Sequence, residues 1–248
     1  MKVSIITATF NSSLTVRDTL KSIAEQDHND IEHIIIDACS SDDTLQIVNG
    51  FPHIGKIISE KDNGIYDAMN KGIRIASGNV VGILNSDDIY VHSSVISKVA
   101  KCFEDEKIQA VYADLQYVQH NDINKVIRTW RTGSFNKKKF YYGWMPPHPT
   151  FFVRKKVYEE IGLFDLSLHS AADYEFMLRA LLKYEMPVHY IPEILVKMRA
   201  GGVSNATFKN RIKANREDRM AWKINGLQPY FFTLYAKPIR KIPQFIKK

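Results

Sequence analysis

The chain has 248 residues, of which 45% are hydrophobic, a length and composition that suit one sizeable α/β domain with an appendage. Its formal net charge of +7 is uneven, because residues 201–248 hold 11 Lys and Arg against 2 Asp and Glu, a balance of +9. The two cysteines are far apart, which excludes a disulfide framework and a zinc knuckle, and no apolar run approaches the roughly 18 residues of a membrane span. The amino terminus lacks the pattern of a signal peptide, so we expect a cytoplasmic protein.

Apolar runs and amphipathic patterns alternate along the first part of the chain. Strands are predicted at residues 3–9, 32–37, 56–59 and 80–84, and helices at residues 14–25, 43–48, 65–76 and about 94–103. Regular alternation of strand and helix predicts an α/β fold with a mainly parallel, Rossmann-like sheet flanked by helices, through at least residue 115.

The pattern loosens after this point. Strands are predicted at 110–119, 125–131 and 188–198, helices at 155–161 and 172–184, and a proline-rich rigid loop at 146–149. The first two of these strands read as an antiparallel extension of the sheet. A glycine pair at 201–202 ends the compact part, which predicts one domain over residues 1–205 and a basic, aromatic, helical extension over 206–248.

Polar residues stand where the first two predicted strands end. Thr7, Thr9 and Asn11 close the first strand and Asp37 closes the second, and in a parallel sheet these ends face one edge. Hydroxyls, an amide and a carboxylate suit the edge of a nucleobase or a ribose. The alternative for Asp37 is a loop cap. Neither a dinucleotide fingerprint nor a P-loop is present, which argues against NAD and against a transferred ATP phosphate.

Two adjacent carboxylates, Asp87 and Asp88, follow the buried run of the fourth strand. Burying two unpaired ionised acids is too unfavourable for a stable fold. At the mouth of a parallel sheet, a hard divalent cation can neutralise them, so this pair predicts a metal-assisted site. The alternative is that Asp88 caps the next helix.

Four segments together resemble, in order and spacing, the family 2 glycosyltransferases of GT-A fold. They read SIITATFN (4–11), IDACSSDDT (36–44), DNGIYDAMNKG (62–72) and LNSDD (84–88). The resemblance spans about residues 1–205, and several linked motifs are more specific than any one alone. It implies that a nucleotide-diphosphate sugar lies across the crevice, with Mn²⁺ or Mg²⁺ bridging its diphosphate.

The resemblance also assigns residues to the donor site. Asp87 is the principal metal ligand, and Asn85 stands where the family often has its first aspartate, a departure that bears on metal affinity. Donor binding falls to Thr7, Ala8, Thr9, Asn11, Asp37, Asp62, Lys71, Asn85, Ser86 and Asp88. Lys71 as a plain surface lysine is the alternative, whereas Tyr66 and Met69 are expected to pack in the core.

Inverting transfer needs a base that takes the proton from the acceptor hydroxyl, and the resemblance places it at Asp173. The alternatives are a helix cap at Asp173 and, in another register, Glu175 as the base. His148 lies in a segment similar to the family's acceptor-side loop. Arg199, followed by residues 201–204, resembles a loop that folds over bound donor, where its guanidinium pairs with phosphate.

Aromatic side chains alternate with Lys and Arg after residue 208. This composition predicts peripheral attachment to the cytoplasmic face of the inner membrane, where a lipid-linked acceptor would be presented. Nucleic acid is not expected as a partner, because no recognition helix or stacking sheet is predicted. A dimer contact or a packing arm is the third interpretation.

The sequence thus predicts an inverting glycosyltransferase that moves a sugar from a nucleotide-diphosphate sugar, with UDP favoured by family habit. The acceptor is a hydroxyl of a saccharide or lipid-linked saccharide in surface polysaccharide or glycan biosynthesis. Two alternatives stay open: a nucleotide-sugar binding module without catalysis, and a nucleotidyltransferase. The second is disfavoured because no glycine-rich, basic phosphate loop follows the first strand.

Overall fold

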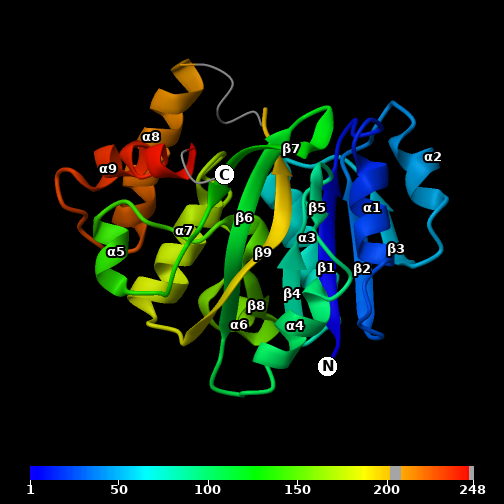
Figure 1. The fold of residues 1–248 in the computed structure, drawn as a ribbon, viewed down its shortest axis with the longest axis horizontal. Helices are drawn as coiled ribbons and strands as arrows, with labels where there is room; N and C mark the ends of the chain where they lie inside the picture. The colour runs from blue at the N-terminus through cyan, green and yellow to red at the C-terminus, as the bar shows by residue number, and fades with distance from the viewer. Residues whose placement is uncertain (202–207, 246–248) are drawn as a thin grey trace.

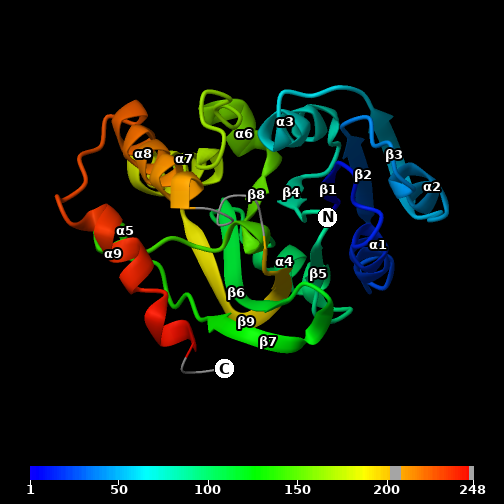
Figure 2. The same ribbon diagram turned by 90° about the horizontal axis from the view of Figure 1, so that it is seen from above.

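The computed structural model describes residues 1–201 and 208–245, with the backbone alone for residues 208–212. Within these ranges, nine strands form one sheet that is covered by helices on both faces (Figures 1 and 2). The strands are β1 (Val3–Thr9), β2 (Ile31–Asp37), β3 (Ile54–Ser59), β4 (Val80–Ile83), β5 (Asp88–Tyr90), β6 (Ala110–Gln119), β7 (Asp122–Trp130), β8 (Phe152–Arg154) and β9 (Val188–Arg199). The helices are α1 (Val16–Ala24), α2 (Thr44–Asn49), α3 (Ile65–Ile75), α4 (Val95–Cys102), α5 (Lys137–Tyr141), α6 (Lys155–Ile161), α7 (Ala172–Leu178), α8 (Phe208–Ile224) and α9 (Thr233–Ile239).

The amino-terminal part of the sheet is parallel, as the alternation of strand and helix predicts. β3, β2, β1 and β4 lie side by side in this order, and all three pairings are parallel. Every residue of β1 is buried, because the strand lies between two neighbours and under helices on both faces. The carboxyl ends of β1, β2 and β4 therefore share one edge, onto which Figure 2 looks down.

The rest of the sheet is mixed. β8 pairs antiparallel with β4 and with β6, and β7 pairs antiparallel with β6, as predicted for the extension. β9 runs parallel to β6 and antiparallel to β5. The three-residue strands β5 and β8 and the short helix α5 have no counterpart in the sequence prediction, because such short segments show too few residues to display a period.

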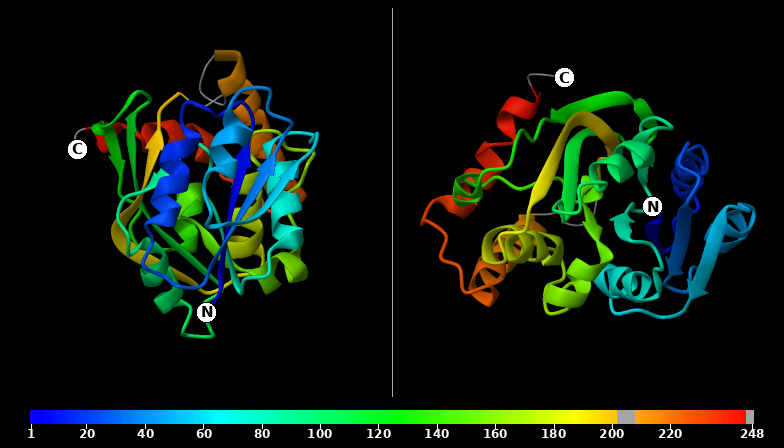
Figure 3. Two further views of the ribbon diagram at one scale, coloured as in Figure 1. Left: turned by 90° about the vertical axis from the view of Figure 1, so that its right-hand side faces the viewer. Right: turned by 90° about the horizontal axis from the view of Figure 1, so that it is seen from below.

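Alternate residues of β1 face two hydrophobic layers. Ile6 and Ala8 pack with the layer that contains α3, α6 and α7, whereas Val3 and Ile5 pack with the layer that contains α4. Figure 3 shows α1 and α3 on opposite faces of the sheet. The helix predicted over residues 172–184 is α7 followed by a π-helical turn, Arg179–Lys183. Its buried apolar side chains all belong to the hydrophobic layer that contains α3 and α6.

Of the carboxyl-terminal helices, α8 packs against α7, as Figure 1 shows, and α9 packs against α8. Trp222 of α8 is wholly buried and donates a hydrogen bond from Nε1 to Tyr174 Oη at 2.9 Å. Lys237 of α9 pairs with Asp218 of α8 at 2.7 Å, and Leu234 is 2% exposed. One face of this extension is therefore part of the core of the molecule.

Two sequence predictions fall partly outside the described residues. These are the loop over residues 201–204 that resembles a lid, of which only Gly201 is described, and the domain boundary at residue 205. Among the helices described, none is long and apolar enough to cross a membrane.

Candidate active site

A cavity of about 1040 Å³ opens at the edge where β1 and β4 end. The β1–α1 loop, the start of α3, the β4–β5 loop, the segment before β8 and the start of α7 all contribute to its wall. Nine of the predicted site residues line it: Ala8, Thr9, Asn11, Asp62, Asn85, Ser86, Asp87, His148 and Asp173. Five others do not: Thr7, Asp37, Lys71, Asp88 and Arg199.

Asp37 serves the loop that follows β2. Its carboxylate accepts hydrogen bonds from Thr9 Oγ1 at 2.9 Å, from Ser59 Oγ at 2.7 Å, and from both the amide and the hydroxyl of Ser40. Burial alone would raise the pKa of this carboxyl, but these donors together hold it below its usual value. The side chain is 0% exposed, so the geometry is that of the loop cap, and the neighbouring Ala38 reaches the cavity instead.

The loops after β1 and β2 are joined to each other at the cavity. Asn11 has a left-handed backbone with φ of 48°, a conformation that asparagine tolerates better than most residues. Its side-chain Oδ1 accepts a hydrogen bond from the backbone amide of Ser41 at 2.9 Å, and its backbone amide donates to Ser40 Oγ at 2.9 Å. Ser12 Oγ lies 2.8 Å from Ser86 Oγ, which ties the first loop to the β4–β5 loop. The mouth of the cavity is thus built by side-chain contacts between loops.

The β4–β5 loop carries oxygen atoms that the described protein leaves without hydrogen bonds. Asp87 lines the cavity. Burial raises the pKa of Asp87, partly opposed by Arg199 and His148. Asn85 Oδ1 and Asp88 Oδ1 are buried without a partner. Asp88 lies in β5 and is wholly buried, and Ser94 occupies the cap position of α4, so the alternative that Asp88 caps that helix is wrong.

These oxygens fit a hard divalent cation, which prefers carboxylate and carbonyl ligands. No group of three or more His, Cys, Asp or Glu suited to a metal occurs in the described part of the chain. Mg²⁺-type sites in nucleotide enzymes use one or two carboxylates and complete their shell with phosphate oxygens and water. Asp87 and Asn85, in one loop at the cavity, offer a carboxylate and an unpartnered amide oxygen suited to that kind of site.

Asp173 faces the cavity from the first turn of α7. Tyr66 Oη donates to its Oδ1 at 2.9 Å, and His148 Nδ1 lies 3.4 Å from its Oδ2. Ala171 occupies the cap position, so the alternative that Asp173 caps this helix is wrong. Burial and then Asp173 raise the pKa of Tyr66 well above its usual value, which keeps this phenol protonated as a donor.

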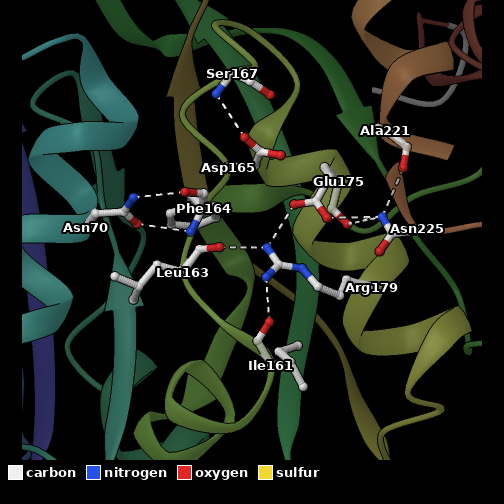
Figure 4. A network of polar contacts seen from close by, with 10 residues as sticks. All are labelled: Asn70, Ile161, Leu163, Phe164, Asp165, Ser167, Glu175, Arg179, Ala221 and Asn225. Carbon is white, nitrogen blue, oxygen red and sulfur yellow. Dashed lines mark hydrogen bonds and ion pairs between the residues drawn. The ribbon is translucent and has the colours of Figure 1, made fainter. Parts of the chain in front are cut away.

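Glu175 points away from the cavity, into the network of Figure 4. It is 1% exposed, pairs with Arg179 at 2.8 Å, and accepts a hydrogen bond at 3.1 Å from Asn225, the residue that follows α8. Arg179 also donates to the carbonyls of Ile161 and Leu163, both at 2.6 Å. Glu175 is therefore excluded as a substitute base, and its network fixes α7 against its surroundings.

Lys71 and Arg199 also bind the protein itself. Lys71 pairs with Glu60 at 2.8 Å and donates to the Lys61 carbonyl at 2.8 Å. Arg199 is 4% exposed, donates to the Asp87 carbonyl at 2.9 Å and pairs with Asp18. A guanidinium in these contacts anchors the β4–β5 loop, which differs from the predicted contact with donor phosphate.

The cavity wall also contains polar residues that the sequence analysis did not assign to the site, among them Tyr66, His120, His169 and Lys213. Tyr66 packs against the core, as predicted, and its hydroxyl in addition reaches Asp173 at the cavity. Met69 is buried in the core, as predicted, and also lines the cavity. His120, His169 and Lys213 also line the cavity, from the β6–β7 turn, the loop before α7 and α8 respectively. None of these three lies in a recognisable motif, so only the three-dimensional path of the chain could reveal them.

Known proteins resemble this chain in sequence. The sequence model described as glycosyl transferase family 2 matches residues 4–162. A PGL/p-HBAD biosynthesis glycosyltransferase of Mycobacterium bovis (strain BCG / Pasteur 1173P2) is 30% identical over 208 residues, which are 82% of this chain and 78% of that protein. An uncharacterized glycosyltransferase of Bacillus subtilis (strain 168), YwdF, is 28% identical over 194 residues, 75% of this chain and 70% of that protein.

Solved structures share the fold. S. aureus TarS 1-349 in complex with UDP-GlcNAc aligns with a TM-score of 0.72 at 19% identity, covering 98% of this chain and 73% of that one. The mannosyltransferase PcManGT from Pyrobaculum calidifontis, in complex with GDP-Man and Mn²⁺, aligns with a TM-score of 0.67 at 18% identity, covering 95% and 68%. These alignments confirm the predicted α/β architecture of GT-A type.

Proposed function

The chain belongs to glycosyl transferase family 2 and is a glycosyltransferase, and on this premise we propose that it transfers a sugar from a nucleotide-diphosphate sugar to a hydroxyl group with inversion. The observation that carries the proposal is the position of Asp87 and Asp173 on two walls of one cavity. One carboxylate faces the place suited to a cation and diphosphate, and the other faces the space left for an acceptor.

Asp173 acts in this proposal as the general base. An ionised carboxylate can take the proton of the acceptor hydroxyl as that oxygen attacks the anomeric carbon from the face opposite the leaving group. Tyr66 donates to one oxygen of Asp173 and His148 Nδ1 lies 3.4 Å from the other, which orients the carboxylate. Asp87 would hold Mn²⁺ or Mg²⁺, with the Asn85 oxygen beside it. When bound, such a cation supplies stabilisation of the charge that develops on the leaving nucleoside diphosphate.

The donor is proposed to be a UDP-sugar. Two solved structures of similar fold hold UDP-GlcNAc and GDP-Man respectively, so nucleotide-diphosphate sugars are the class to examine. Hydroxyls and amides of the β1–α1 loop, with Asp62 and Ser86, are placed around the cavity where a base, a ribose and a diphosphate need donors and acceptors.

The acceptor is proposed to be a saccharide or lipid-linked saccharide, presented at the cytoplasmic face of the inner membrane. The outer face of the extension supports this proposal. Tyr235 and Ile239 lie one helical turn apart on α9 and are 60% and 64% exposed, and Phe231 just before the helix is 88% exposed. Exposed aromatic and aliphatic side chains in a segment of net charge +9 suit an anionic leaflet.

Point variants test this attachment better than deletion, because deleting residues 226–248 would also remove the buried Leu234. The double variant Phe231→Ser/Ile239→Ser should bind less to phosphatidylglycerol vesicles in cosedimentation, while Leu166→Ser, at an exposed site elsewhere, should bind like the original chain. Equal binding of all three proteins to anionic vesicles would defeat the proposed membrane face.

Calorimetric titration with UDP, GDP and dTDP, each with and without Mn²⁺, tests the donor class. Asp173→Asn then tests the base: we expect transfer to fall by about 10²–10⁴-fold while donor affinity stays within about threefold. Glu160→Gln is the matched control, since it changes an exposed carboxylate to an amide on α6. Full turnover by Asp173→Asn would refute the assignment of the base.

A further inference from the structure

Four side chains form a continuous polar chain between the β4–β5 loop and the start of α7. Asn85 Nδ2 lies 3.1 Å from Asp88 Oδ2 and 3.3 Å from His148 Nε2. The other ring nitrogen, His148 Nδ1, lies 3.4 Å from Asp173 Oδ2. The chain thus connects the loop that carries Asp87 with the carboxylate assigned as the base.

The buried Asp88 determines which way the Asn85 amide points. Asp88 is 0% exposed, and the structure places the Asn85 nitrogen, Nδ2, against its Oδ2 as the donor at 3.1 Å. The two hydrogens of Nδ2 then point to Asp88 Oδ2 and to His148 Nε2, so Nε2 has to be an unprotonated acceptor.

The surroundings of the second ring nitrogen, His148 Nδ1, indicate the same tautomer. An ionised Asp173 can only accept, and Tyr66 already donates to its Oδ1. The ring nitrogen that faces Oδ2 should therefore carry the hydrogen. A neutral imidazole has a single N–H, and both neighbours place it on Nδ1. The hydrogen bond from Asn85 and the negative charge of Asp173 beside Nδ1 both favour this tautomer over the other.

We propose that Asn85 is a positioning residue that fixes the Nδ1–H tautomer of His148, so that the Nδ1 hydrogen lies beside one oxygen of Asp173 while Tyr66 donates to the other. The inference rests on the proposed role of Asp173 as the base. An ionised aspartate at position 85 has no hydrogen to donate. It would repel the Asp88 carboxyl group and favour a hydrogen on His148 Nε2. This gives a physical reason for asparagine where the family pattern often has aspartate.

The first test reads the tautomer directly. In the full-length chain, ¹⁵N spectra of the histidine rings distinguish a protonated from an unprotonated nitrogen, and the His148→Asn variant identifies the His148 signals by their loss. We expect His148 to carry its hydrogen on Nδ1 in the original chain and to gain one on Nε2 in Asn85→Asp. An Nε2–H tautomer in the original chain, or the same tautomer in both proteins, would overturn the proposal.

The second test uses turnover at saturating donor, with the donor dissociation constant measured for every variant. The amide nitrogen of asparagine can take the place of His148 Nδ1, whereas that of glutamine takes the place of Nε2. His148→Asn should therefore keep turnover within about tenfold of the original chain, and His148→Gln should lower it about 100-fold. Asn85→Asp should lose about 100-fold alone but less than about tenfold in the His148→Asn background. Equal losses in both backgrounds would show that Asn85 does not act through His148.

The two tests separate this proposal from the proposed function. If the original chain transfers no sugar from any nucleotide donor, the proposed function fails, while the ring spectra still decide the tautomer. If transfer is found but the tautomer does not depend on Asn85, only the positioning role fails.

Discussion

The buried ion pair of α7 allows a sharp prediction about stability. Arg179 and Glu175 are one helical turn apart, with side chains 13% and 2% exposed, and Arg179 donates in addition to two backbone carbonyls (Figure 4). Replacing Arg179 by Met leaves the Glu175 carboxylate with Asn225 as its remaining side-chain donor. Removing one partner of a buried pair lowers the free energy of unfolding by about 3–5 kcal/mol, so we expect a loss in this range.

The measurement is urea unfolding at pH 7. The slope of the unfolding free energy against urea concentration should be the same as in the original chain, which shows that the variant unfolds from the same native state. The double variant Glu175→Gln/Arg179→Met should recover at least half of the loss, since it removes the uncompensated charge and keeps an acceptor for Asn225. Lys21→Met is the matched control: Lys21 pairs with Glu25 one turn away, but both side chains are more than 60% exposed. Its effect should stay below about 0.5 kcal/mol.

The same variant has a defined pH dependence. Burial raises the pKa of Glu175, opposed by Arg179, so loss of Arg179 raises this pKa further. A carboxyl whose pKa is higher in the folded than in the unfolded state lowers stability while it is ionised and stops doing so once protonated. The deficit of Arg179→Met should therefore shrink between pH 7 and pH 5. A deficit below about 1 kcal/mol at pH 7, or one that grows on acidification, would refute the reasoning.

Three further predictions concern the site, the sheet and acid stability. Asp87→Ala should weaken Mn²⁺-dependent donor binding by about tenfold or more in calorimetry, or about 1.4 kcal/mol, and unchanged binding would exclude Asp87 as the ligand. Gly82→Ala should lower the unfolding free energy by about 1–3 kcal/mol, because its Cβ would lie 2.4 Å from the Phe152 ring, whereas Gly55→Ala, with 3.6 Å to its nearest neighbour, should not. Glu32 is buried, which alone would raise its pKa, but donors from neighbouring serines and a lysine lower the pKa to about 2 from 4.5. Ionised Glu32 should add at most about 3 kcal/mol to the free energy of unfolding above about pH 4.5, and this stabilisation should disappear toward pH 2. In urea unfolding, Glu32→Gln should therefore reduce the loss of stability between pH 4.5 and pH 2. An unchanged loss over this pH range would contradict the assignment.

The parallel part of the sheet and the position of the cavity were predictable from the sequence. Each rests on local information: a run of apolar residues marks β1 or β4, and the polar residues that follow mark the shared edge. Asp87 and Asp173 were placed by motif resemblance, and both do line the cavity. Hydrophobic period and order along the chain suffice for such features, because each strand end carries its own signal.

Only the tertiary structure decided what each polar side chain does at that edge. Asp37 and Lys71 bear the residue types expected of ligand contacts, yet neighbouring loops supply partners that engage them within the protein. Tyr66 and Asp173 are 107 residues apart in sequence and meet through one hydrogen bond. A side chain's role depends on which donors and acceptors surround it, and those come from segments that no local pattern connects. The sequence therefore determined which chemical groups are available, and the packing of distant segments determined which of them face the cavity.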